Sequence, residues 1–272
     1  MQELINHPAV QAGFAPFLIA IIISELFLRI RLSGLAIIAG FAVTVYLVSD
    51  FGYEPLTATR KIIWLGLFSA ALGLLFGSAI SNWRSWLLVA LSAAATTWTL
   101  QRILEQQEMN LALQWGAACA VYVAVLVWGM DKLLEKEALR VSCAATALGI
   151  GTGGAALIGA SALLGQIGLA LGSAAAAHLV IKFISNQPLP TGRMFTLPLA
   201  LIAGLTGCLA VLSAQLPWYT LPILAGIPLA ALLMPLPKQS FRVQILLLTF
   251  ITFIFVAGAL YVTWRAAGNV PL

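Results

Sequence analysis

One histidine and one lysine in the second half of this sequence are spaced to act together. His178 is the only histidine within an apolar run, and Lys182 follows it by four residues. Residues four apart lie on one face of a helix, so this imidazole and ammonium could together bind an anionic group. A neutral, hydrogen-bonded packing histidine is the other interpretation. A metal or haem would need further ligands, and the second histidine, His7, lies near the opposite end of the chain, so we expect no metal and no cofactor.

A carboxylate within the first apolar run is a second candidate. Glu25 lies in the segment IIISELFLRI, and an ionised group at membrane depth is a functional candidate by default. Arg29 follows it by four residues, in the Glu-then-Arg order that favours an ion pair along a helix. Since Arg29 marks the end of the run, Glu25 would lie about 6 Å inside that end. We therefore interpret Glu25 either as half of an interfacial ion pair or as a proton- or cation-coupling residue.

A dense run of glycines is the third candidate site. The run 149–154 contains Gly149, Gly151, Gly153 and Gly154. Each glycine weakens a helix by about 1 kcal/mol relative to alanine, so we expect local unwinding there. Unwound backbone inside a transporter commonly lines a substrate or ion site. A nucleotide-binding loop is excluded, because the run has neither a preceding strand nor a Gly-Lys-Ser/Thr end.

Small residues at helical spacing give these glycines a second interpretation. Such rows let helix backbones approach closely inside a membrane, and in that case the glycines serve packing and bind no solute. Three rows are present: Gly151, Ala155 and Gly159; Gly168, Gly172 and Ala176; and Ser69, Gly73 and Gly77.

The composition identifies the environment that must position these residues. Of the 272 residues, 61% are hydrophobic and only 8% are charged, and the mean hydropathy is +1.01. Soluble domains have about 25% charged residues. The chain is therefore predicted to be an all-α, polytopic integral membrane protein whose principal partner is the lipid bilayer. The net charge of +5 comes from basic residues placed singly or in pairs between apolar runs, which indicates membrane topology and not nucleic-acid binding.

Ten apolar segments are long and continuous enough to be membrane helices. Barrel strands would alternate every second residue over about ten residues, and these segments do not. No long polar linker interrupts them, so residues 1–272 form one transmembrane domain. The stretch 141–184 is read as two helices that turn at Gly165-Gln166. The segments are 9–29, 32–49, 62–80, 86–103, 111–130, 141–164, 166–184, 196–214, 219–236 and 243–263.

The basic residues predict the orientation. One set of alternate loops holds ten Lys and Arg residues, and the other set, with the termini, holds four. By the positive-inside rule, both termini lie outside the cytoplasm of an inner (plasma) membrane. The charged loop 131–140 divides ten helices into halves of five, 1–137 and 138–272, which would then have opposite orientations, as in inverted-repeat transporters.

Two functions of different classes fit this pattern. The first is a secondary transporter or permease for a small solute, with a site near the bilayer midplane at the glycine run. The second is a non-catalytic subunit or assembly factor that packs against other membrane subunits of a larger complex. A membrane enzyme is disfavoured, because the sequence has no interfacial cluster of Asp, Glu, His or Arg and therefore no candidate catalytic residue. The three cysteines form no CxxC pair, which argues against a zinc site.

Overall fold

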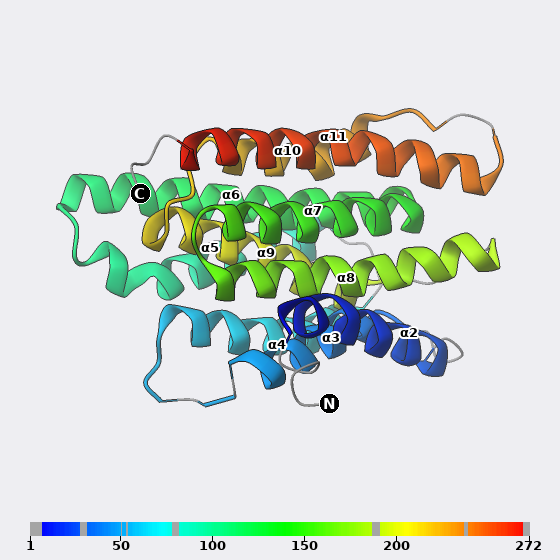
Figure 1. Ribbon diagram of the computed structural model, residues 1–272, viewed down its shortest axis with the longest axis horizontal. Helices are drawn as coiled ribbons and strands as arrows, with labels where there is room; N and C mark the ends of the chain where they lie inside the picture. Colours follow the sequence, from blue (N-terminus) through cyan, green and yellow to red (C-terminus); the bar gives the residue numbers. More distant parts are fainter. Residues whose placement is uncertain are drawn as a thin grey trace.

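The computed structural model describes residues 7–27, 32–49, 51–52, 54–77, 82–186, 191–236 and 239–268. These ranges form ten helices and no strands (Figure 1). The first helix, α2 (Ala15–Phe27), continues from the π-helical segment η1 (Val10–Phe14). The other helices are α3 (Leu35–Val48), α4 (Ala58–Phe76), α5 (Asn82–Leu104), α6 (Met109–Lys136), α7 (Ala138–Ile158), α8 (Ala162–Ser185), α9 (Arg193–Ser213), α10 (Thr220–Leu233) and α11 (Phe241–Ala267).

The all-α prediction is confirmed, and each of the ten predicted segments coincides with one helix. Eight helices are long and apolar enough to cross a membrane, when η1 and α2 are counted together as one helix over Val10–Phe27. The two that are shorter, α3 and α10, have 14 residues each, or about 21 Å against a hydrocarbon core of about 30 Å. The division into two inverted halves stays a prediction.

Helix α9 lies at the centre of the bundle. It packs against α3, α4, α5, α6, α7 and α8, and every residue from Arg193 to Ala210 is buried. A helix that is apolar on all sides must be surrounded by protein or lipid, and here protein surrounds it. Outer helices instead expose large apolar side chains, such as Ile22 on α2 (57% exposed) and Phe250 on α11 (68% exposed), which is the surface that a bilayer covers.

The turn within 141–184 differs from our prediction. Helix α7 ends at Ile158 and α8 begins at Ala162, so the chain turns at Gly159–Ser161 and not at Gly165-Gln166. Ala160 adopts a positive φ of 65° there. The predicted local unwinding is also absent, because α7 is one continuous helix through the whole glycine run.

The glycines of α7 and α8 interlock directly. A Cβ atom built on Gly149 would lie 2.3 Å from the backbone nitrogen of Gly172, and one on Gly153 would lie 2.3 Å from that of Leu169. A Cβ on Gly168 would in turn lie 2.5 Å from the backbone of Gly153. The two helix backbones therefore meet with no side chain between them, as the packing interpretation predicts.

Other glycines of the run 149–154 and of the third row also face helices of the same chain. Gly151 lies against Leu224 of α10, and Gly154 lies against Leu260 of α11. Gly73 of the third row packs on the backbone of Met194 in α9. Gly77 has a different role from the one predicted, since it caps the end of α4 with a φ of 60°.

Substituting Gly153 with Ala should test this interlock. The new methyl group would meet the α8 backbone, which cannot rotate away, so we expect a loss of about 1–3 kcal/mol in the free energy of unfolding. Thermal unfolding of the purified protein in detergent measures the effect. Gly258→Ala on α11 is the matched control, because its Cβ would lie 3.7 Å from the nearest atom, in ordinary contact. Equal stability of the two variants would contradict the interlock.

Candidate functional site

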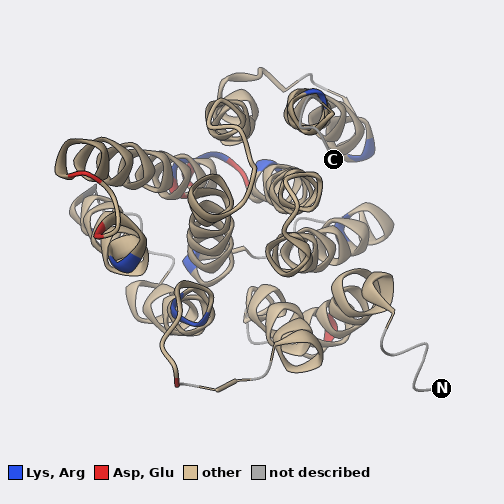
Figure 2. Cartoon of the chain, turned by 60° about the vertical axis from the view of Figure 1, so that its left-hand side comes forward, with Lys and Arg blue, Asp and Glu red and all other residues tan. Residues whose placement is uncertain are grey.

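Buried polar groups gather at one end of the bundle, which we call the basic end. It is formed where α6 and α8 finish and where α5, α7, α9 and α11 begin. Charged residues occupy few positions in the chain, separated by long uncharged stretches (Figure 2). The described basic residues at this end are Arg84, Lys132, Lys136, Arg140, Lys182, Arg193 and Arg242.

Lys182 is the most unusual of these residues, because its side chain is fully buried at 0% exposure. Its Nζ atom donates to the carbonyl oxygen of Ala138 at 2.8 Å and to Ser142 Oγ at 2.7 Å, both at the start of α7. A weaker contact of 3.5 Å reaches Thr191 Oγ1, just before α9. All three acceptors are neutral oxygens, and among the described residues no carboxylate forms an ion pair with Lys182.

His178 lies one turn further into the bundle on the same helix and is also fully buried. Its Nδ1 atom is 3.5 Å from Ser24 Oγ of α2. Its ring lies against Phe195 of α9, with the centroids 5.0 Å apart. The Nε2 atom has no hydrogen-bond partner within the described ranges. The structure therefore places His178 and Lys182 together at the buried junction of α8 with its neighbours.

Glu25 lies apart from this junction. Its side chain is exposed on α2, whereas the preceding residue, Ser24, is the one that faces His178. Its predicted partner, Arg29, lies outside the described residues. A coupling role for Glu25 stays a prediction.

The structure adds a buried ion pair that sequence reasoning missed. Arg193, the first residue of α9, donates from Nε to Asp131 Oδ1 at 2.7 Å and from Nη2 to Asp131 Oδ2 at 3.1 Å. Ser85 of α5 donates its hydroxyl to Asp131 Oδ2 and accepts from Arg193 Nη2 at 3.1 Å. This bidentate geometry satisfies both charges, and it ties together α5, α6 and α9.

In the sequence, Asp131 begins the charged loop 131–140 and Arg193 lies just before the predicted segment 196–214, so both resemble solvated loop charges. Lipid can cover an apolar helix on every side as well as protein can. The sequence therefore gives no signal that the helix beginning at Arg193 is enclosed by protein, or that its first residue needs a buried counter-charge.

Two other basic residues stabilise the end of α10. Arg140 Nη1 donates to the carbonyl oxygens of Ala231 and Met234, and Lys136 Nζ donates to that of Leu232 at 3.0 Å. Carbonyl groups at a helix C-terminus lack partners within the helix, and cations there also interact favourably with the helix dipole. Arg140 and Lys136, which belong to the basic residues that predict the orientation of the chain, therefore also stabilise the C-terminal end of the short helix α10.

Comparison with known proteins gives no family to guide the interpretation: the sequence matches no family model and no curated protein. Within the described ranges, no three His, Cys, Asp or Glu side chains come together in a way that could hold a metal ion. The functional argument therefore rests on the buried charges at the basic end.

Removing one partner of the Asp131–Arg193 pair should destabilise the protein strongly. Asp131→Leu leaves a buried guanidinium without a counter-charge, which costs about 3–5 kcal/mol, and Arg193→Met leaves a buried carboxylate with a similar cost. The double variant should recover most of this loss, because two apolar side chains need no partner. Thermal unfolding of the two single variants and the double variant forms the cycle that measures the coupling. Additive losses in the double variant would show that the pair does not act as a unit.

Proposed function

We propose that this protein is a secondary transporter of the inner membrane for a small anionic solute, and that Lys182 binds the anion. The single observation that carries the proposal is the burial of the Lys182 ammonium among neutral acceptors only. Ionisable residues within membrane helices are rare, because the apolar surroundings oppose the charge, and those that occur mark substrate and ion pathways. An anion beside Lys182 would supply the counter-charge that the described residues lack.

Contrast with Arg193 strengthens this interpretation. Both side chains are buried at the basic end, but Arg193 has a bidentate carboxylate partner, whereas Lys182 has none among the residues that the structure describes. Arg193 is therefore accounted for by structure alone. His178, one turn away on α8, adds a second group that could donate a hydrogen bond to an anion.

A surface hollow at the basic end provides access. It has a volume of about 390 Å³ and is lined by Glu137, Ala138, Leu139, Phe241 and Gln244. Ala138, whose carbonyl oxygen accepts from Lys182, is one of the residues of this wall, so the ammonium is one hydrogen bond away from a residue that lines the hollow. Arg140 and Lys136 flank Glu137 along the chain, and their excess positive charge favours the approach of anions.

In this proposal the glycine run 149–154 has a structural role and does not bind the solute. Gly149, Gly151, Gly153 and Gly154 contact neighbouring helices, and no open space for a solute lies beside Gly149 or Gly153. By holding α7 against α8, they position Ser142 beside Lys182. The proposed binding site therefore lies near the basic end and not at the glycine run.

The alternative role, a structural subunit or assembly factor of a larger complex, is suggested by the short loops, the few polar groups within the apolar segments and the small residues that could receive partner helices. Gly73, Gly149, Gly153, Gly168 and Gly172 all pack within this chain. Their use inside the bundle supports a protein that functions by itself.

The orientation that accompanies this proposal puts the basic end in the cytoplasm and both termini outside it. Alkaline phosphatase fused to the C-terminus should therefore be active in cells, and green fluorescent protein fused there should be dark. Fusions after Glu137, at the basic end, should give the reverse. Fluorescence from the C-terminal fusion would contradict the orientation.

Lys182→Met tests the transport proposal directly. Purified protein in liposomes would be given concentration jumps of phosphate, sulfate, nitrate, acetate and succinate, while charge displacement and internal pH are recorded. We expect at least one anion to give a saturable signal in the natural protein, reduced at least about tenfold in Lys182→Met, because the group that attracts the anion is gone. Lys132→Met is the matched control, since Lys132 is partly exposed and pairs with Glu135.

The stability of Lys182→Met separates a functional lysine from a structural one. A buried charge without a counter-charge destabilises the fold, so Met should leave the unfolding temperature unchanged or raise it. A marked fall would mean that Lys182 is needed for folding. The transport proposal fails if no anion gives a saturable signal, or if Lys182→Met transports as well as Lys132→Met.

A further inference from the structure

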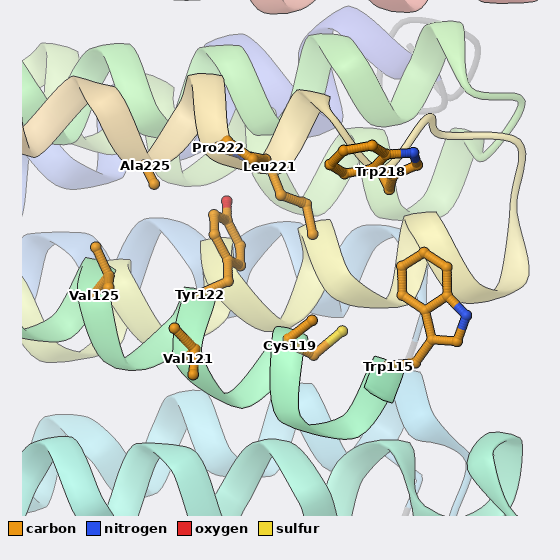
Figure 3. A pocket seen from close by; sticks show the side chains of 10 residues that line it. Trp115, Cys119, Val121, Tyr122, Val125, Trp218, Leu221, Pro222 and Ala225 are labelled. Atoms are coloured by element: carbon orange, nitrogen blue, oxygen red, sulfur yellow. The ribbon is translucent and has the colours of Figure 1, made fainter. Parts of the chain in front are cut away.

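A second, chemically different cavity lies between α6 and α10, toward the end opposite the basic end. It has a volume of about 360 Å³. Its walls are three aromatic side chains, Trp115, Tyr122 and Trp218, together with aliphatic groups and Cys119 (Figure 3). None of the described residues that line it is charged. A solute transported as an ion would find no partner here.

The cavity faces the surface that lipid covers. Val121, on its rim, is 62% exposed and Trp218 is 60% exposed, and both belong to helices or turns on the outside of the bundle. Trp218 precedes α10, at the level where an amphipathic indole meets the membrane interface. A molecule dissolved in the bilayer can therefore enter from the side.

Among the described residues that line the cavity, Tyr122 is the one with a buried side-chain oxygen that lacks a hydrogen-bond partner. Its side chain projects from α6 toward α10 (Figure 3), and the residue is 6% exposed. Its hydroxyl group has no hydrogen-bond partner among the described residues, although it lies beside Gly207 of α9. A buried hydroxyl without a partner is costly, so each such group in a native structure needs an explanation.

We propose that this cavity binds the head ring of a membrane-soluble quinone, with Tyr122 donating a hydrogen bond to a ring carbonyl. The two indoles provide flat apolar faces on which an aromatic or quinonoid ring can pack. The Tyr122 hydroxyl is covered by neighbouring atoms in the ligand-free structure, so binding requires a small shift of this side chain that lets the hydroxyl donate to a carbonyl oxygen. The lipid-facing opening leaves the alkyl tail in the bilayer. A saturated acyl chain would use the apolar walls but would leave the hydroxyl unsatisfied.

A neighbouring cavity offers a matched control within the same chain. It lies between α5 and α6, has a volume of about 260 Å³, and shares Val121 and Val125 with the first cavity. It also has two tryptophans, Trp86 and Trp128, but its lining has no buried hydroxyl. Partition of any apolar compound into lipid-facing grooves would affect both cavities equally, whereas the proposed ligand should prefer the first.

The test uses the purified full-length protein and a benzoquinone with a decyl tail as the probe, with binding followed by quenching of tryptophan fluorescence. We expect saturable binding that Tyr122→Phe weakens about tenfold through loss of one hydrogen bond. Trp128→Phe, in the control cavity, should change the dissociation constant less than about twofold. Decanol, which has the tail without the ring, should not compete.

Several outcomes would overturn the proposal. Quenching that never saturates would indicate partition alone, and equal competition by decanol would indicate a site for acyl chains. An unchanged dissociation constant in Tyr122→Phe would remove the role of the hydroxyl. A lower unfolding temperature of ligand-free Tyr122→Phe would show that the hydroxyl already has a structural partner, and would also count against it.

Discussion

The structure depends on the complete burial of α9. A helix without a polar face cannot lie at the surface of a soluble protein, and here it also has little contact with lipid, because other helices surround it. Its burial imposes the requirement that its first residue, Arg193, be neutralised inside the bundle, and Asp131 of α6 meets this requirement with help from Ser85. The same helix provides Phe195 against His178 and the backbone on which Gly73 packs. Six of the nine other helices that the structure describes, α3 to α8, pack against α9.

The two proposed sites differ in the charge and polarity of the residues that form them, and this difference fits their positions in the bundle. Near the basic end, where the bundle meets water and headgroups, Lys182 is a buried cation without a carboxylate partner among the described residues, which suits an anion that arrives from solution. Between α6 and α10 the walls are aromatic and uncharged, so a ligand must arrive through the bilayer. The two proposals are therefore independent. The anion site at Lys182 does not require the cavity between α6 and α10, and the cavity does not require the anion site.

The sequence was sufficient to predict the fold class, the ten helices and most of their limits, because a helix in lipid has a length and composition that few other structures share. It also brought His178 and Lys182 together correctly through their spacing. It could not predict at which glycine the chain turns between α7 and α8. The predicted turn is at Gly165-Gln166, whereas the observed turn is at Gly159–Ser161. It also could not distinguish charges in solvated loops from charges buried at helix ends: Asp131, Arg193 and Arg140 each lie at the edge of an apolar run, and only their three-dimensional partners reveal their roles. Tyr122 was missed for a similar reason, since one tyrosine in an apolar helix gives no sign that its hydroxyl lacks a partner.

The interlocked glycines also limit how this protein can move. Since the backbones of α7 and α8 meet directly at Gly149 and Gly153, rotating either helix about its axis would bring side chains into the space where only glycines fit. Conformational change in tightly packed proteins takes place between discrete packed arrangements, so α7 and α8 must move as one body. Lys182 would then keep Ser142 beside it in every state, and any opening toward either side of the membrane must occur along the surfaces that this pair shares with α2, α3, α6, α9, α10 and α11.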